Sequence, residues 1–437
     1  MNTREQIIKK LAPKEFNTLG VIWVSLLSIV SLIGIIAYID QIIKGLVVTN
    51  LRDYAIWGVY ISNFVFFVAT SFVGAFTASI LRLSQKKWRT PLVRIAEMVS
   101  VAAIAMAGVA IILDMGRPDR IPYLFIYPRL QSPIAWDIII ITIYLAFSIL
   151  LLYIPSIPDF AILKKHNQHK PFLSRFYGFL AINWKGTEKQ IKIHQKSIKV
   201  IAVSMIPLAL ILQSVDAWLF STTYRIGWDS TNLGPYFISG AIVAGLGALI
   251  SAIYLVRKFN NLEEFITEKH FDKLGRALVF ACLVYLYFNM NEYLVPAFKS
   301  TQGEVKHLQE LFFGKYALMF WFSVGGGVML PSVLLMFRKM RKPFPIFLIA
   351  VLVVVTSWWK RYLIVSPALL HPFMPIQGVP EDWAHYFPSM HEWIITLGTL
   401  ALCALIVTIF IRFIPVVPIQ RTMDEMEITA TENDKNQ

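Results

Sequence analysis

The chain has 437 residues, of which 56% are hydrophobic and only 16% charged, and its formal net charge is +14. A soluble domain of this length does not need so apolar a composition, so we predict an integral membrane protein. The two cysteines, Cys282 and Cys403, both lie in apolar runs. Two thiols exclude a disulfide framework and a thiolate-held iron–sulfur cluster within this chain.

Ten apolar segments are long enough to cross a bilayer, whose hydrocarbon core of about 30 Å requires about 20 apolar residues per helix. They cover roughly residues 18–43, 55–83, 93–113, 133–155, 198–221, 234–256, 274–298, 315–337, 342–364 and 389–415. The predicted fold class is therefore all-α. The second to fifth and sixth to ninth segments could form two four-helix bundles flanked by the first and last. Residues 1–17 lack the pattern of a removable signal peptide, so we expect the first helix to remain.

The distribution of basic residues predicts the orientation of the chain. With ten spans, both termini and four of the loops lie on one side, and that side carries 30 of the 41 Lys and Arg residues. By the positive-inside rule this side, with both termini, is cytoplasmic. The net positive charge therefore reflects membrane topology and does not indicate a nucleic-acid partner.

Two segments are expected outside the membrane on the cytoplasmic side. Residues 156–197 are rich in lysine, and we interpret them as surface helices on anionic lipid headgroups and not as a catalytic domain. The tail 416–437 is polar and acidic, which is typical of disorder.

Strongly polar side chains are costly at membrane depth, so those that persist are candidates for function. In this topology they all gather toward the exterior side. They are Asp114 and Arg117, Asp137, Gln213 and Asp216, Glu292, Lys360 and Arg361, and His391 and Glu392.

Several of these side chains also have a structural explanation. Asp114 and Arg117 share a helix face if their helix continues, so they could form a self-contained ion pair, or Arg117 could cap the helix. Asp216 follows a long apolar run without a nearby cation, which favours a functional carboxylate over interhelical hydrogen bonding. Glu292 fits either interpretation. Lys360 and Arg361 could simply extend to the lipid headgroups.

The histidines argue against haem. All eight fall in loops or at predicted helix ends: His166, His169, His194, His270, His307, His371, His385 and His391. No pair lies in mid-membrane to ligate an iron atom from two sides. Haem b is therefore not expected in this chain.

Several distinct motifs follow one another along most of the membrane part of the sequence. They are WGVYISNFVFFVATSFVGAF, KKWRTPLVRIAEM, LDMGRPDR with YPRLQSPIAWD, LQSVDAWLF, RIGWDSTNLGPYFISGAI, WWKRYLIVSPAL and HYFPSMHEWIITLG. In this order and spacing the sequence resembles the NrfD/PsrC family, the quinone-interacting membrane subunits of respiratory oxidoreductases. Its length resembles the ten-helix members of alternative complex III and of Dsr and polysulfide or sulfite reductase-like complexes.

The resemblance implies a function for the chain in the prokaryotic cytoplasmic membrane. A member would bind quinol or quinone, menaquinone in particular, near the exterior face without a haem or cluster of its own. It would exchange electrons with a ferredoxin-like iron–sulfur subunit, next to a catalytic or multihaem subunit, and it would show no activity alone. In some complexes the family is proposed to move protons.

Two departures from the family bear on the site. Many long members have a histidine near the position of Phe72 and another at the position of Gln213. Without them, we predict that Asp114 is the principal hydrogen-bond or proton acceptor and that Arg117 orients it. The remaining candidates are Asp137, Asp216 and Glu292 for a proton relay, and Tyr60, Asn63 and Trp136 for the surroundings of the quinone ring.

Two rival functions remain open. A membrane anchor with a degenerate quinone site would account for the missing histidines. A secondary transporter would need a polar site near the midplane, where this sequence has few charges. Binding of a quinone-site inhibitor would argue against the first, and counterflow by the isolated chain would favour the second.

Overall fold

The chain folds into a bundle of long helices in the computed structural model, which describes residues 3–84, 89–223, 225–371, 378, 380, 383 and 385–425. These ranges contain helices and no strand, and ten helical spans within them are long and apolar enough to cross a membrane. The spans are α2 (Thr18–Lys44), α3 (Val59–Leu83), α4 (Thr90–Asp114), α6 (Pro133–Tyr153), α9 (Glu188–Ser221), α10 (Leu233–Phe259), α11 (Glu268–Lys299), α13 to α14 (Ala317–Leu334), α15 (Pro343–Leu369) and α16 (Met390–Phe413). The predicted all-α fold with ten membrane helices is confirmed.

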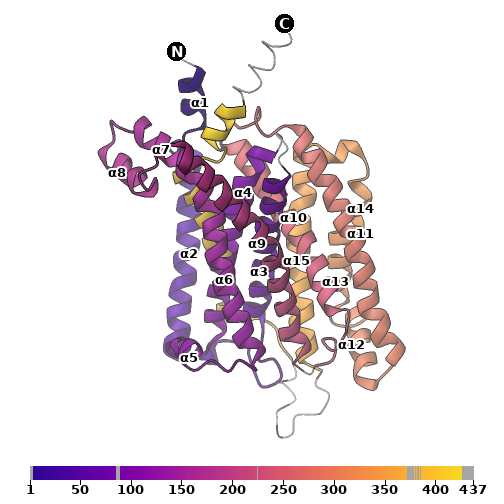
Figure 1. The fold of residues 1–437 in the computed structure, drawn as a ribbon. Coiled ribbons are helices and arrows are strands. Elements are labelled where there is room, and N and C mark those ends of the chain that lie inside the picture. Colours follow the sequence, from indigo (N-terminus) through magenta and orange to yellow (C-terminus); the bar gives the residue numbers. More distant parts are fainter. Residues whose placement is uncertain are drawn as a thin grey trace.

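Short helices lie at both ends of the bundle. They are α1 (Thr3–Leu11), α5 (Ile121–Ile126), α7 (Ile157–His166), α8 (Pro171–Leu180) and α12 (Gln302–Phe312). Helix α1 and residues 419–425 lie at the same end, which we call the terminal face, and α5 and α12 lie at the opposite end, the far face (Figure 1).

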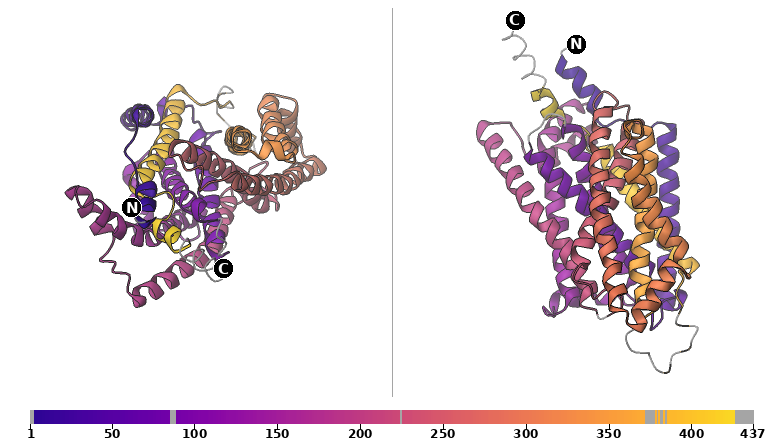
Figure 2. Two further views of the ribbon diagram at one scale, coloured as in Figure 1. Left: turned by 90° about the horizontal axis from the view of Figure 1, so that it is seen from above. Right: turned by 90° about the vertical axis from the view of Figure 1, so that its right-hand side faces the viewer.

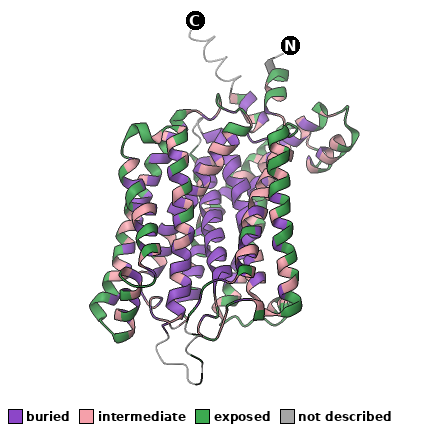
Figure 3. Ribbon diagram, turned by 180° about the vertical axis from the view of Figure 1, so that it is seen from behind, coloured by how far each residue is buried: buried purple, intermediate pink, exposed green. Residues whose placement is uncertain are grey.

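The long helices pack as two groups around a shared centre. Helices α3, α4, α6 and α9 contact one another, and α10 and α15 pack with α11 and the α13–α14 segment. Helix α3 also contacts α10 and α15, so it joins the two groups and is buried along most of its length (Figure 3). Helices α2 and α16 pack on each other beside α3 and α4, as the view down the bundle shows (Figure 2).

The contact between α2 and α16 depends on two glycines. A Cβ atom on Gly34 would lie 2.8 Å from the Cα of Gly398, and one on Gly398 would lie 2.7 Å from the Cα of Gly34. Both distances are shorter than van der Waals contact, so only glycine at both positions allows the helix backbones to approach this closely.

Several helices extend beyond the apolar segments that the sequence marks. Helix α9 begins at Glu188, well before the expected start at 198, because Thr187 and Gln190 form a capping box that begins the helix outside the apolar run. Helix α15 continues to Leu369. Lys360 and Arg361 therefore lie inside α15, and not at its end as the sequence had indicated.

The start of the tail folds back onto the terminal face. The backbone N–H of Gln420 donates to Asp159 Oδ1 at 2.9 Å, and Thr90 Oγ1 donates to Glu425 Oε1 at 2.9 Å. Asp159 itself forms a buried ion pair with Arg94 at 2.5 Å. Residues 416–425 of the tail that we expect to be disordered are thus packed, and the remainder, 426–437, lies outside the described residues.

Candidate functional site

The far end of α4 is held in place by side chains of α2. Gln41 Nε2 donates to the Leu113 carbonyl at 2.9 Å, and Tyr38 donates to the Ile112 carbonyl at 3.3 Å. The last carbonyls of a helix have no partner within it, so these bonds satisfy groups that would otherwise remain unpaired. Tyr60 of α3 in turn donates to Gln41 Oε1 at 2.7 Å. The position of Asp114, the last residue of α4, is therefore fixed by α2 and α3.

The Asp114 carboxyl group has unused hydrogen-bonding capacity. Its Oδ1 atom is buried and has no hydrogen-bond partner among the described residues, although the residue as a whole is only half-buried. Asp114 interacts electrostatically with Glu392 and with Tyr60. We call Gln41, Tyr60, Asp114 and Glu392 the Asp114 cluster. It can accept a hydrogen bond from a ligand that reaches the end of α4.

Glu392 was a candidate as a strongly polar residue at membrane depth, but we assigned it no role in the quinone site. It is fully buried and accepts from Tyr386 at 2.6 Å and from the backbone N–H groups of Asn50 and Ser389 at 2.9 and 2.8 Å. The motif SMHE, with Ser389 and Glu392 as a capping box, explains it as a helix start. Burial, followed by the charge of Glu392, raises the pKa of Tyr386 well above its usual range, so this tyrosine remains a donor.

Arg117 does not accompany Asp114 in this structure. Helix α4 ends at Asp114, and the backbone of Arg117 has left the helix with φ −137° and ψ 79°. Its side chain is exposed, and within the described part of the chain it forms neither the ion pair with Asp114 nor a bond that caps the helix. The common helix face that the ion pair required is therefore absent.

A second acidic site lies between α6 and α9, where Asp137 and Asp216 are both buried and their carboxyl groups contact each other. No donor from the described residues reaches either oxygen of Asp216. Two adjacent carboxyl groups can share a single proton. Arg361 of α15 supplies an electrostatic interaction with Asp216, a cation that chain order alone did not reveal.

The other residues predicted around the ring have different positions. Asn63 is buried and fully engaged, because its amide nitrogen donates to Thr396 at 2.9 Å and its oxygen accepts from Trp358 Nε1 at 2.7 Å. Trp136 is exposed and donates to the Leu130 carbonyl at 2.5 Å. Asn63 therefore joins α3, α15 and α16, whereas Trp136 lies on the surface.

The two positions where many long relatives have histidine are also buried. Phe72 stacks on Phe76 with ring centroids 5.3 Å apart. Gln213 lies one helical turn before Asp216, and its Nε2 atom has no partner in the described part of the chain. Gln213 thus retains an unused donor near the acidic pair.

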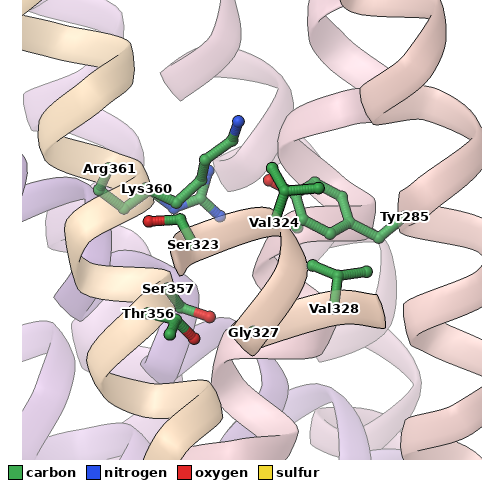
Figure 4. A pocket seen from close by; sticks show the side chains of 10 residues that line it. Tyr285, Ser323, Val324, Gly327, Val328, Thr356, Ser357, Lys360 and Arg361 are labelled. Carbon is green, nitrogen blue, oxygen red and sulfur yellow. The ribbon is translucent and has the colours of Figure 1, made fainter. Parts of the chain in front are cut away.

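Lys360 and Arg361 are both buried, so the interpretation that they extend to the headgroups is wrong. Lys360 Nζ donates to the Tyr293 hydroxyl at 2.6 Å and lies 4.7 Å from the centre of the Phe320 ring. The Arg361 guanidinium group lies over Phe237 at 5.3 Å, and its NH1 atom has no partner among the described residues. Figure 4 shows this guanidinium group beside Ser323 in a pocket. Helix α15 can therefore bury both cations, because aromatic rings and carboxyl groups surround them.

The pocket in Figure 4 is bordered by an eight-residue π-helical segment, η5 (Phe322–Met329). A Cβ atom on Gly327 of this segment would lie 2.2 Å from Thr356 Oγ1. The glycine therefore allows η5 to lie directly against α15. Wide helical turns of this kind are frequent at functional sites.

Glu292 lines a second pocket, nearer the far face. Ser230 and Asn232 each donate to its Oε2 atom at 3.1 Å. His307 of α12 also lines this pocket. His307 is buried, with no partner for Nδ1 among the described residues. Burial, together with the nearby charge of His371, lowers the pKa of His307 to about 3.

The structure therefore separates the predicted candidates into three places. Asp114 and Tyr60 lie together at the end of α4, Asp137 and Asp216 form a pair between α6 and α9, and Glu292 lies among α11 and its neighbours. All three places lie in the far half of the membrane helices. Gln41 and His307 were not predicted as site residues, because each resembles an ordinary polar residue at a helix end, and Glu392 was a candidate without an assigned role.

Comparison with known proteins identifies relatives over almost the whole chain. The family model described as polysulphide reductase, NrfD, matches residues 47–372. A putative membrane subunit of dimethyl sulfoxide reductase from Halobacterium salinarum is 28% identical over 97% of both chains. A selenate reductase subunit from Mesobacillus selenatarsenatis is 22% identical over 90% of this chain and 94% of its own. A menaquinone reductase integral membrane subunit of Nitratidesulfovibrio vulgaris is 22% identical over 88% and 89%.

Proposed function

Because this chain belongs to the polysulphide reductase NrfD family and is a multi-pass integral membrane protein, we propose that it is the quinol-reactive membrane subunit of a respiratory oxidoreductase complex. The relatives named above support this, since they include membrane subunits of dimethyl sulfoxide and menaquinone reductases. In the proposal the terminal face is cytoplasmic, menaquinol reacts near the far face, and electrons pass to an iron–sulfur partner subunit next to a catalytic or multihaem subunit.

The observation that carries the proposal is the unpartnered Oδ1 atom of Asp114. A quinol hydroxyl that approaches the end of α4 would donate to this oxygen, and the carboxylate would take its proton as the ring is oxidised. General bases act within hydrogen-bond reach of the proton that they remove. Gln41 and Tyr60 would hold the end of α4 in place, whereas Arg117 is left free to meet the partner subunit or lipid.

Oxidation of one quinol releases two protons and two electrons. The proton acceptor must therefore pass on each proton before it can take the next. The acidic pair Asp137–Asp216 and the more distant Glu292 are suitable for a relay, because each is a buried carboxyl group with polar neighbours. This assignment adds proton movement to the proposal. It also explains why acidic groups persist at membrane depth despite their cost.

The test uses the whole complex, purified from membranes by a tag on this chain. Asp114→Asn preserves the size of the side chain and removes the base, and we expect quinol-dependent turnover to fall by about 100-fold or more. Asp119→Asn is the matched control, because Asp119 is exposed beyond Pro118. Equal turnover of the Asp114 variant and the control would refute the role of Asp114.

The membrane-anchor function has one observation in its favour: phenylalanine and glutamine replace the two histidines common in long relatives. A complex that binds no quinone-site inhibitor, yet retains activity with an artificial electron donor, would identify the chain as an anchor.

A further inference from the structure

The helices α7 and α8 form a hairpin that projects sideways from the bundle at the terminal face. Figure 1 shows it at the upper left, and the view from above in Figure 2 also places it outside the outline of the membrane helices. An element in this position lies above the lipid that surrounds the bundle. The bilayer surface is therefore what lies beneath it.

One side of α8 anchors it to the body of the protein. Tyr177 is buried, and its hydroxyl donates to the Phe413 carbonyl at 3.1 Å. Its ring stacks on Phe160 of α7 with centroids 6.1 Å apart, and Phe176 contacts Phe413 at 5.5 Å. The hairpin thus has a fixed orientation, which determines what its other side presents.

The opposite side of α8 is apolar and basic. Phe172 and Phe179 are 80% and 82% exposed, and Arg175 is exposed between them. Positions 172, 175 and 179 recur every three to four residues, so they form one stripe along the helix. Two phenylalanines so fully exposed on a single stripe require a covering surface.

The hairpin carries mostly basic charge near this stripe. Residues 160–187 contain Lys164, Lys165, Lys170, Arg175 and Lys185 and no aspartate or glutamate. Lys170 is paired with Glu15 at 2.7 Å, and the other four are exposed. Basic side chains beside exposed aromatic rings are typical of helices that lie in the plane of a membrane.

We propose that the α7–α8 hairpin binds anionic phospholipid headgroups at the terminal face. Phe172 and Phe179 enter the boundary of the acyl chains, and the four exposed basic side chains contact headgroup phosphates. The occupant is a lipid surface and not a protein partner, because the hairpin projects beside the membrane helices and its stripe combines exposed rings with basic side chains. The proposal does not depend on the quinol reaction.

The test measures hydrogen–deuterium exchange of peptides from 171–182 in the full chain in nanodiscs. One set contains phosphatidylcholine alone, and the other also contains phosphatidylglycerol. We expect exchange to be slower with phosphatidylglycerol by at least about fivefold, the factor expected when one basic side chain is attracted to an anionic surface. The difference should vanish when Lys164, Lys165, Arg175 and Lys185 are all replaced by glutamine.

The control replaces four exposed basic residues elsewhere at this face by glutamine: Lys258, Lys269, Arg338 and Lys339. It should leave the lipid difference unchanged. Phe172→Ser with Phe179→Ser should speed exchange in phosphatidylglycerol without changing the thermal unfolding of the chain in detergent. Equal exchange in the two lipids would overturn the proposal. So would slowing in phosphatidylcholine that occurs only within the assembled complex, because that result would identify a protein as the occupant.

Discussion

Replacing Gln41 by leucine tests whether α2 holds the end of α4. The substitution removes two buried bonds, from Gln41 to the Leu113 carbonyl at 2.9 Å and from Tyr60 to Gln41 at 2.7 Å. Hydrogen bonds between membrane helices average about 0.6 kcal/mol, so the two bonds together contribute about 1.2 kcal/mol. The Tyr60 hydroxyl also loses its buried partner, which adds about 1 kcal/mol. We therefore expect a loss of about 2 kcal/mol in the free energy of unfolding.

The assay is reversible unfolding of the purified chain in mixed micelles, followed by tryptophan fluorescence, for Gln41→Leu, Tyr60→Phe and the double variant. Because both single changes remove the same bond, the double variant should lose about 0.6–1.5 kcal/mol less than their sum. Ser31→Ala is the control on the same helix, since Ser31 is buried and its Oγ atom has no partner in the described residues. Strict additivity, or a Gln41→Leu loss no larger than that of Ser31→Ala, would refute the reasoning.

Two further predictions concern packing and pH. Gly398→Ala should destabilise the chain by about 1–3 kcal/mol, because the new Cβ would lie 2.7 Å from Gly34 Cα. Gly108→Ala should not destabilise it, because the space around that Cβ is open. The same unfolding assay checks both variants. The pKa of His307 is about 3 when folded and about 6.5 in an unfolded chain, so below pH 6.5 the unfolded state binds the extra proton and stability should fall toward pH 3. Between pH 7 and 5, the unfolding temperature of His307→Gln should decrease less than that of the wild-type chain. Parallel curves of unfolding temperature against pH for the two proteins would count against this.

The architecture was predictable from sequence because length and apolarity identify a membrane helix. The exact ends of the helices were harder to predict, since they depend on capping residues and on neighbouring helices. Helix α4 stops at Asp114, which leaves Arg117 outside it, and α15 continues past Lys360 and Arg361. A helix end assigned from hydropathy falls at the first charged residues. Hydropathy does not show whether aromatic rings and carboxyl groups from other helices surround those charges and let the helix continue.

The site was predictable only in part, for a related reason. Chain order and topology correctly placed Asp114, Asp137 and Asp216 toward one face. The rotation of each helix about its axis was not available, and that rotation determines which acids meet. It brings Asp137 against Asp216 and turns the amide of Asn63 toward Trp358. Gln41 was missed because a single glutamine at the end of an apolar helix carries no motif.

The glycine contact between α2 and α16 also has a consequence for biosynthesis. Helix α2 is synthesised well before α16, its main packing partner, because the other described membrane helices lie between them in the chain. Until α16 has been synthesised, α2 contacts α3 and α4 through a few side chains, but the surface around Gly34 remains in contact with lipid. A premature stop codon before α16 would therefore leave the glycine surface of α2 uncovered, so truncated chains should be recognised by membrane quality-control proteases through α2.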